Sequence, residues 1–190
     1  MKKFLQNLSS GLSEVQDIPA PVVQEGKILI RTKYSLLSSG TERMILNFAK
    51  SNIIDKAKQQ PEKVKEVINK VKTDGLINTF EAVNSKLQQP ISLGYSNVGE
   101  IIELGRNVEG FKVGDRVISN GSHSEIVLVP KNLCCVIPEN VEDEAAVFTV
   151  LAAIGLQGIR LANPTLGETF LVSGLGLIGL LTAQLLKSQN

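Results

Sequence analysis

The sequence is poor in the residues that build metal centres and disulfide frameworks. Its 190 residues include two cysteines, one histidine and no tryptophan. The cysteines, Cys134 and Cys135, are adjacent in a run predicted to be a strand, where neighbouring side chains point to opposite faces. We interpret them as small core or flanking residues, with a reactive dithiol as the alternative. Because a tetrahedral zinc site needs several Cys and His ligands, neither a catalytic nor a structural zinc is expected.

Long apolar runs and an excess of charge are also missing. No stretch reaches the roughly 20 apolar residues that span a bilayer. The N-terminus, Met1-Lys2-Lys3-Phe4-Leu5-Gln6-Asn7, lacks the apolar region of a signal peptide. A formal net charge of +1 favours neither nucleic acid nor an acidic partner. We therefore expect a cytoplasmic protein that binds no nucleic acid and no membrane, with a core for one or two domains.

Alternating apolar residues predict strands on both sides of a helical region. The clearest strand is Lys27–Tyr34, and residues 1–41 as a whole carry strand signals. After Pro90, turn residues separate four more predicted strands, at Val98–Leu104, Arg116–Ser119, Glu125–Val129 and Leu133–Ile137. Several short strands at this spacing favour a barrel or sandwich.

Helical periodicity takes over from Glu42 to Leu87. One helix is predicted from Pro61 to the Asp74-Gly75 pair and a second from Leu76 to Leu87. The first is rich in lysine, which suits either a docking site for an anionic substrate or partner or simply a solvated helix face. A further apolar helix is predicted from Glu142 towards Asn163-Pro164.

A glycine-rich turn follows the apolar run Phe170-Leu171-Val172, which is predicted to be a strand. It has G-x-G-x-x-G spacing and precedes a predicted helix, Leu177–Lys187. In a dinucleotide-binding turn, the first glycine permits the sharp bend, the second lets a pyrophosphate approach the backbone and the third lets helix pack on strand. The phosphates would lie at the helix N-terminus. The motif comprises Gly174, Leu175, Gly176, Leu177, Ile178 and Gly179, and the alternative is an ordinary strand-to-helix turn.

These features occur in the order found in one known superfamily. The residues that carry the likeness are Gly94–Gly105, Val113–Val117, Ile137-Pro138-Glu139 and the glycine motif. They resemble the medium-chain dehydrogenase/reductase superfamily, the alcohol dehydrogenase-like enzymes. The Ser38–Glu42 segment with the helical region is similar to the N-terminal part of bacterial two-part oxidoreductases.

The resemblance implies a mixed α+β and α/β fold. It consists of a partly open GroES-like β-barrel with a helical insertion, followed by the first βα unit of a Rossmann domain. The barrel domain would cover residues 1–138, with the insertion at about 43–90. Residues 139–190 would begin a Rossmann domain that binds NAD or NADP. A βαβ unit takes about 30 residues, so we expect the sequence to be part of a longer oxidoreductase, and whether these residues alone are active stays open.

The resemblance also supplies candidate site residues. Zinc members of the superfamily carry a Cys-Gly-x-Asp segment where this chain has Ser39-Gly40-Thr41-Glu42, and Gly-His-Glu where it has Gly94-Tyr95-Ser96. Both usual ligands are thus replaced, and a third position falls near Thr149. Without a metal, hydroxyl donors would polarise a carbonyl during hydride transfer, which makes Thr41, Tyr95 and Ser39 the catalytic candidates. They could instead merely fill the space of lost ligands.

Four expectations remain open. His123 is interpreted as a solvent-facing turn residue, with a role as acid or base as the alternative. The subgroup likeness suggests a small, sugar or nucleotide-sugar related substrate, and an oligomer could form through further Rossmann strands or the helical insertion. The alternative to an NAD(P)-dependent, zinc-independent oxidoreductase is a non-catalytic module, a degenerate barrel that binds a ligand or partner.

Overall fold

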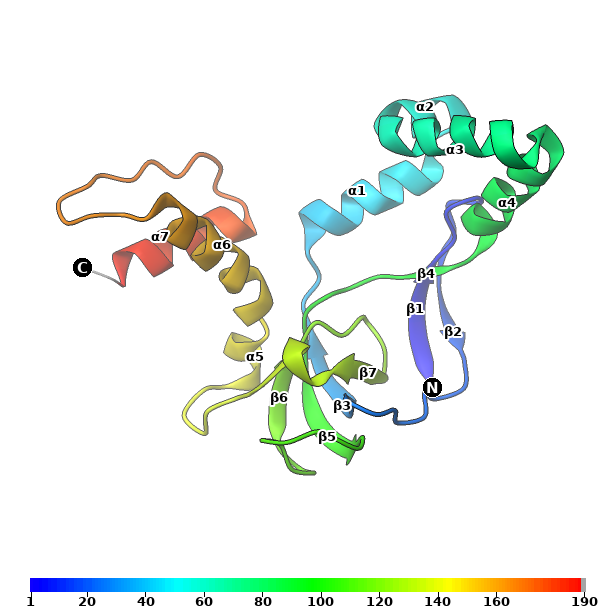
Figure 1. Cartoon of the computed structure of the whole chain (residues 1–190). Coiled ribbons are helices and arrows are strands. Elements are labelled where there is room, and N and C mark those ends of the chain that lie inside the picture. The colour runs from blue at the N-terminus through cyan, green and yellow to red at the C-terminus, as the bar shows by residue number, and fades with distance from the viewer. Residues whose placement is uncertain (189–190) are drawn as a thin grey trace. The chain divides into compact units, whose positions relative to one another are not determined.

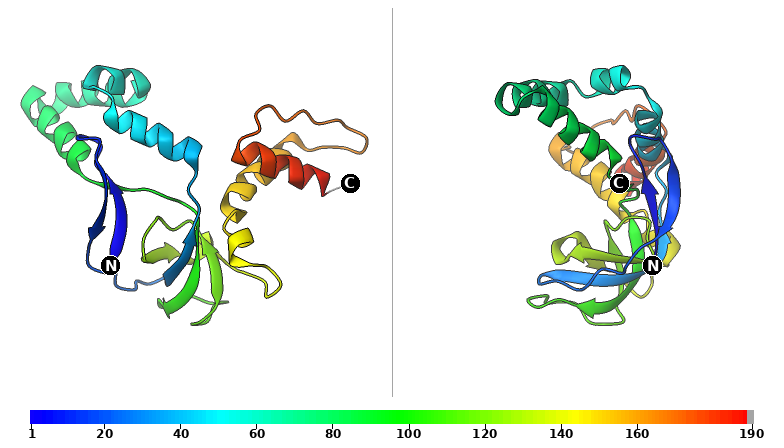
Figure 2. Two further views of the ribbon diagram at one scale, coloured as in Figure 1. Left: turned by 180° about the vertical axis from the view of Figure 1, so that it is seen from behind. Right: turned by 90° about the vertical axis from the view of Figure 1, so that its right-hand side faces the viewer.

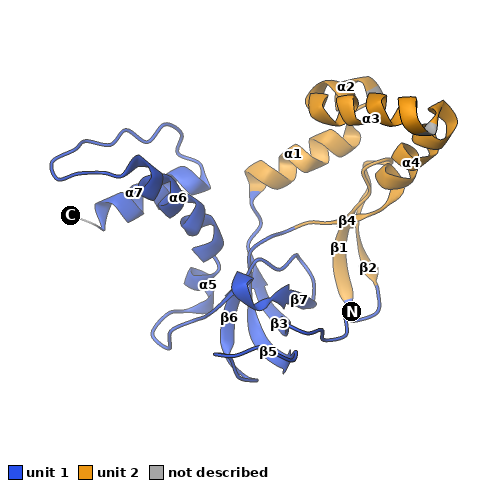
Figure 3. Ribbon diagram, viewed as in Figure 1, with its two compact units in different colours: residues 1, 18–38, 94–190 blue, residues 2–17, 39–93 orange. Residues whose placement is uncertain are grey.

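The chain divides into two compact units. The computed structural model describes residues 1–188, without the side chains of Ile53 and Asp74. One unit, called the barrel unit, contains Met1, Ile18–Ser38 and the chain from Gly94 onward. The other, called the helical unit, contains Lys2–Asp17 and Ser39–Leu93. Figure 3 colours the two units separately.

A five-stranded antiparallel sheet forms the centre of the barrel unit (Figure 1). Its strand order is β7-β3-β5-β6-β8, and the short helix η1 (Lys131–Leu133) precedes β8. The strands are β3 (Lys27–Ser35), β5 (Asn97–Leu104), β6 (Arg116–Ser119), β7 (Ile126–Pro130) and β8 (Cys134–Val136). The five strands expected in this region are therefore confirmed, with shifts of one residue at some ends.

The core of this sheet comes from alternate residues of neighbouring strands. Ile28 and Ile30 of β3 and Ile101 of β5 are fully buried. The antiparallel register places Ile30 opposite both Ile101 and Val127, so one face of the sheet becomes continuously apolar. Fully burying such a side chain contributes about 1.5–3 kcal/mol relative to exposing it, so these positions fix which face of each strand points inward.

Three helices follow the sheet in the barrel unit: α5 (Asp143–Ala146), α6 (Thr149–Ala162) and α7 (Leu177–Lys187). Helix α7 has the expected bounds, and α6 ends at Asn163, which adopts a left-handed conformation with φ 48°. The single helix expected from Glu142 is wrong in one respect, because it is broken at Val147. The hydroxyl of Ser96 donates to the carbonyl of Val147 over 2.6 Å, which takes that carbonyl out of a continuous helical ladder.

The apolar run before the glycine motif is not a strand in this structure. Residues 163–175 have no helix or strand, and Leu171 is 95% exposed. A parallel strand gains its hydrogen bonds from neighbouring strands and is normally covered on both faces. No described strand pairs with this segment, so its sequence preference alone does not produce a ladder.

The helical unit combines a small sheet with four helices. Its sheet has the order β2-β1-β4, from β1 (Lys2–Gln6), β2 (Ser13–Asp17) and β4 (Ile91–Ser92). The helices are α1 (Ser39–Lys50), α2 (Ile53–Gln59), α3 (Pro61–Asp74) and α4 (Leu76–Gln88). Both expected helices, α3 and α4, are confirmed, and Figure 2 gives two further views of them. Helical structure begins earlier than expected, at the first residue of α1.

The mixed α+β and α/β fold class is confirmed, since antiparallel strands of a barrel precede the helices around the glycine motif. The division into a domain of residues 1–138 and a second domain from residue 139 stays a prediction, and the last two residues of that second stretch lie outside the described part. Within residues 1–188, no helix has both the length and the apolar character that membrane crossing requires.

Candidate cofactor and substrate site

The glycine motif forms a tight turn at the start of α7. Gly174 has φ +94°, a conformation that residues with a side chain rarely adopt. A Cβ on Gly179 would lie 1.9 Å from the carbonyl oxygen of Gly174, so the helix meets the turn too closely for any side chain there. Gly176 differs, because a Cβ on it would meet nothing within 4 Å. The three glycines thus have the three separate properties that the spacing predicts.

The N-terminus of α7 is open to an anion. Gly176 is its N-cap, no side chain caps the helix, and its first turn contains no acidic residue. Leu175 is 73% exposed beside it. Free N–H groups and the positive end of the helix dipole favour a phosphate at such a position. Helix α6 packs closely against α7, since a Cβ on Gly155 would lie 2.5 Å from the hydroxyl of Thr182.

Segment Gly94-Tyr95-Ser96-Asn97 leads into β5 and is held by buried polar contacts. Ser96, which is 1% exposed, anchors the segment to Val147. The side-chain amide of Asn97 donates to the hydroxyl of Thr32 over 2.8 Å. The other side-chain atom of Asn97, Oδ1, is buried and has no hydrogen-bond partner among the described residues. Two fixed neighbours therefore hold the half-buried Tyr95 on a rigid piece of backbone.

His123 lies against this same segment. A Cβ on Gly94 would come within 2.7 Å of the imidazole ring, and Nδ1 lies 2.8 Å from the hydroxyl oxygen of Ser35. His123 is only partly buried, so its interpretation as a solvent-facing turn residue stays a prediction. The close approach of Gly94 lets the imidazole pack onto the backbone, because glycine has no side chain there.

The three catalytic candidates do not all belong to one unit. Ser39 and Thr41 lie in the first turn of α1, in the helical unit, whereas Tyr95 lies in the barrel unit. Ser39 is exposed and Thr41 is half-buried. Strand signals were expected up to residue 41 and a helical pattern from Glu42, but Ser39 and Thr41 already belong to α1. Their catalytic roles stay a prediction.

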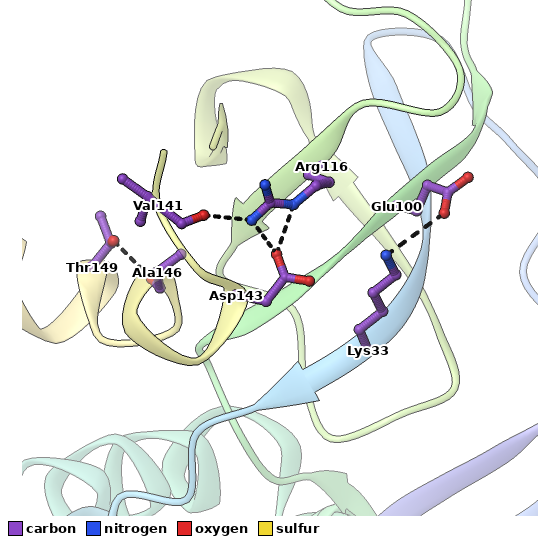
Figure 4. Close-up of polar contacts among 7 residues, drawn as sticks. All are labelled: Lys33, Glu100, Arg116, Val141, Asp143, Ala146 and Thr149. Atoms are coloured by element: carbon purple, nitrogen blue, oxygen red, sulfur yellow. Dashed lines mark hydrogen bonds and ion pairs between the residues drawn. The ribbon is translucent and has the colours of Figure 1, made fainter. Parts of the chain in front are cut away.

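An ion pair connects β6 to the start of α5, as Figure 4 shows. The guanidinium of Arg116 donates to Asp143 through Nε over 2.9 Å and through a terminal nitrogen over 2.7 Å. The same terminal nitrogen donates to the carbonyl of Val141 over 2.6 Å. The side chains of Arg116 and Asp143 are only 32% and 14% exposed, so water screens this pair less than one at the open surface.

Beside it, the hydroxyl of Tyr34 donates a hydrogen bond to the carboxylate of Glu144. This bond and the negative charge of Glu144 raise the pKa of Tyr34 above 10.0. The same bond lowers the pKa of Glu144. Sequence reasoning missed both pairs, because residues 34 and 116 lie far in the sequence from residues 143–144 and only the strand order brings them together.

The two cysteines are not equivalent. Burial raises the pKa of the Cys134 thiol to about 12, whereas Cys135 is exposed on the opposite side of β8. Both are free thiols, and they lie in the expected strand, here β8. Within residues 1–188, no three His, Cys, Asp or Glu side chains gather closely enough to hold a metal ion.

Comparison with known proteins relates this chain to dehydrogenases. Residues 67–139 match the family described as the alcohol dehydrogenase GroES-like domain. Sorbitol dehydrogenase from Halalkalibacterium halodurans is 30% identical over 156 residues, which are 64% of this chain and 45% of that protein. The chain spans about half the length of the curated relatives that it matches.

Solved structures share the fold over nearly the whole chain. Galactitol-1-phosphate dehydrogenase from Escherichia coli aligns with a TM-score of 0.70 at 18% identity, covering 99% of this chain and 53% of that one. A short chain alcohol dehydrogenase from Escherichia coli CFT073, complexed with NADH, aligns with a TM-score of 0.71 at 20% identity. That alignment covers 98% of this chain and 53% of the other.

Proposed function

We propose that this chain is part of an NAD(P)-dependent oxidoreductase. The proposal starts from its resemblance to the alcohol dehydrogenase-like proteins of the medium-chain dehydrogenase/reductase superfamily. The observation that carries the proposal is the turn at Gly174, Gly176 and Gly179. It combines a left-handed first glycine, open space at the second and a close helix approach at the third.

The residues of this turn suit a dinucleotide. The pyrophosphate would lie along the backbone at Gly176, where a side chain would otherwise project, and against the uncapped N-terminus of α7. When bound, the nicotinamide would supply or accept the hydride of the reaction. Whether NAD or NADP is used depends on a residue about 20 positions beyond the glycines, so both stay within the proposal.

Hydroxyl donors would perform the polarising step without zinc. In this proposal a hydroxyl of Tyr95, Thr41 or Ser39 donates a hydrogen bond to the oxygen on which negative charge develops, and such a donor is worth a few kcal/mol in a site shielded from water. The role of Tyr95 is supported by its position on the chain, because the hydrogen bonds of the neighbouring Ser96 and Asn97 side chains hold the backbone there in place. The substrate class is a polyol or sugar derivative, in keeping with the sorbitol and galactitol-1-phosphate dehydrogenases that the chain resembles.

The decisive variant is Gly176→Ala in the full-length protein. The new methyl group meets no protein atom within 4 Å, and the φ of −75° at this residue is one that alanine adopts freely, so folding should be unchanged. The methyl would occupy the space that the pyrophosphate needs. We expect the affinity for NADH or NADPH, followed by nicotinamide fluorescence, to fall by about tenfold or more, as for an overpacked contact of 1–3 kcal/mol.

Gly158→Ala is the matched control. It also adds a methyl group that meets nothing within 4 Å, but in the middle of α6. This variant should bind the cofactor as before and be more stable by up to about 1 kcal/mol, because alanine is the better helix former. Equal cofactor affinity in the Gly176→Ala and Gly158→Ala variants would contradict the proposed cradle.

The donor roles have a separate test in the same protein. Tyr95→Phe and Thr41→Val each remove a hydroxyl while keeping the size of the side chain. With a polyol or keto-sugar that is turned over, we expect kcat to fall by about tenfold to several-hundredfold at unchanged cofactor affinity. If both variants keep the original kcat, these hydroxyls do not stabilise the transition state. Retention of one zinc per chain after washing with a chelator would overturn the metal-free part of the proposal.

A further inference from the structure

The helical unit contains a groove that the proposed oxidoreductase function does not use. Its volume is about 640 Å³, and it lies among α2, α3 and α4, with Leu8 and Phe48 at its border. Apolar side chains from facing helices form much of its wall, namely Phe48, Val64, Val67, Ile68, Val83 and Leu87. Small-molecule sites in proteins occupy about 300–1,000 Å³ and are mostly apolar with a few polar groups. The groove has both the size and the lining of such a site.

Most polar residues of the groove are lysines, and the uncharged Gln60 also lines it. Lys56, Lys63, Lys70 and Lys86 line it together with a single carboxylate, that of Glu66. Glu66 is already paired with Lys63, at 2.9 Å. The groove therefore carries an excess of positive charge beside an apolar wall, which is the complement of a molecule with an anionic end and an apolar body.

Lys56 lies close to both polar and apolar groups of the groove. Its ammonium donates to the carbonyl of Leu8 over 2.8 Å and lies 6.0 Å from the centre of the Phe48 ring. The side chain is thus held at the groove with two ammonium hydrogens left to donate to another acceptor. Lys86, on the last turn of α4, adds a second ammonium on another side of the groove.

We propose that this groove binds a single-chain amphiphile with an anionic head group, of the kind represented by a long-chain fatty acid. The alkyl chain lies along Val64, Val67 and Val83, and the head group accepts hydrogen bonds from Lys56 and Lys86. A small ligand suits the groove better than a protein partner, because stable protein interfaces take roughly 20–30 residues from each side. This site is independent of the cofactor turn, which lies in the other unit.

The test uses the full-length protein and cis-parinaric acid, a fatty acid that fluoresces when it enters an apolar site. We expect saturable binding of one molecule per chain, competed by oleate. Oleyl alcohol, which has the same chain without the charge, should compete about tenfold less well, because a charge-assisted hydrogen bond is lost. Equal competition by oleate and oleyl alcohol would remove the role of the lysines and overturn the proposal.

Two pairs of variants locate the binding. Val83→Trp fills the groove and should weaken parinarate binding by about tenfold or more, whereas Asn84→Trp adds the same side chain at the next, exposed position, outside the groove, and should not. Lys86→Glu should weaken binding by roughly fivefold. Lys65→Glu, which makes the same change of charge outside the groove, should leave it within about twofold. Circular dichroism verifies that each variant is folded.

Three further results would overturn the proposal. One is parinarate affinity that is the same in the Val83→Trp and Asn84→Trp variants. Another is sedimentation of the protein with phosphatidylglycerol vesicles while monomeric parinarate does not bind, since this would assign the lysines to a bilayer surface. The third is an acidic amphipathic peptide that binds the groove where oleate does not. The Gly176→Ala variant should bind parinarate normally, so failure of the cofactor proposal and failure of this one are distinguishable.

Discussion

The sheet of the barrel unit and the helices of the helical unit differ in how completely they bury their apolar residues. In the sheet of the barrel unit, Ile28, Ile30 and Ile101 are fully buried. In α4 of the helical unit, Ile77 and Phe80 are 76% and 69% exposed. Both regions have regular apolar patterns in the sequence, so the pattern alone does not say how much of it is covered.

Strands and helices differ in where the partners of their backbone hydrogen bonds come from. A strand forms its hydrogen bonds only with other strands, so the sheet that assembles also presents a shared face for burial. A helix satisfies its backbone internally and can exist with its apolar stripe only partly covered. Helices α3 and α4 contact each other along part of their stripes, and the rest lines a groove or faces outward.

The largest expected difference between the units concerns their cores. Ile101→Ala removes a fully buried side chain from β5, the strand between β3 and β6, and should lower the free energy of unfolding by about 2–5 kcal/mol. Ile77→Ala makes the same chemical change at an exposed position and should alter stability by no more than about 0.5 kcal/mol. Both stability changes can be measured by hydrogen exchange under native conditions, with the backbone amides of β5 and of α4 followed separately.

A loss of 2 kcal/mol or more in the Ile77→Ala variant would break this contrast. It would mean that another surface covers α4 in solution, and that the exposure of Ile77 does not describe the working protein. A small effect of Ile101→Ala would instead require the sheet to close around the vacated space, contrary to the tight packing of protein interiors.

Two ion pairs, one in each unit, should also differ in strength, by a smaller amount than the two isoleucine variants differ in stability. Arg116 and Asp143 of the barrel unit form a doubly hydrogen-bonded, mostly buried pair, whereas Lys63 and Glu66 of α3 are 67% and 65% exposed. A double-mutant cycle to alanine should give a coupling energy of about 1.5–3 kcal/mol for the first pair. For the second it should give about 0.5 kcal/mol or less. Urea unfolding measures both, and equal coupling energies would show that burial does not decide the strength of these pairs.

Much of the fold could be predicted from residue patterns. Alternation gave the five strands of the barrel sheet, and Pro61 with Gly75 gave the bounds of α3. The errors arose where a distant contact decides local structure. Ser96 breaks the helix expected from Glu142, and the apolar run at Phe170 stays irregular without a neighbouring strand. Neither contact has a signal within a short window of sequence.

The candidate site was predictable to a smaller degree. The backbone properties of Gly174, Gly176 and Gly179 follow from their spacing, because each depends on geometry that is local to the turn, and their role in binding a cofactor stays a proposal. The packing of His123 on Gly94 and the bond from Tyr34 to Glu144 were not predictable. They join segments that are distant in the sequence and depend on strand order, which composition and periodicity leave undetermined.

The smallest expected effect concerns an exposed contact at the edge of the barrel unit. The Tyr34 hydroxyl donates to Glu144, and this raises the pKa of Tyr34 above 10.0. Because the folded-state pKa is raised, the stabilisation from the bond is complete below pH 10.0 and is lost as the pH rises through the higher folded value. The pKa of Glu144 is lowered from 4.5, so the same bond is also lost as the pH falls through that lower value.

The chain has only two tyrosines, which makes this bond directly measurable. In a Tyr95→Phe background, phenolate absorbance reports Tyr34 alone, and its titration midpoint should lie above 10.0. Adding Glu144→Gln removes the neighbouring charge and should bring the midpoint back towards 10.0, whereas Glu142→Gln, a charge change two residues away, should move it less. If the midpoint is the same with and without Glu144→Gln, solvent screens the exposed contact completely, and the edge of the barrel unit then behaves like the exposed face of α3.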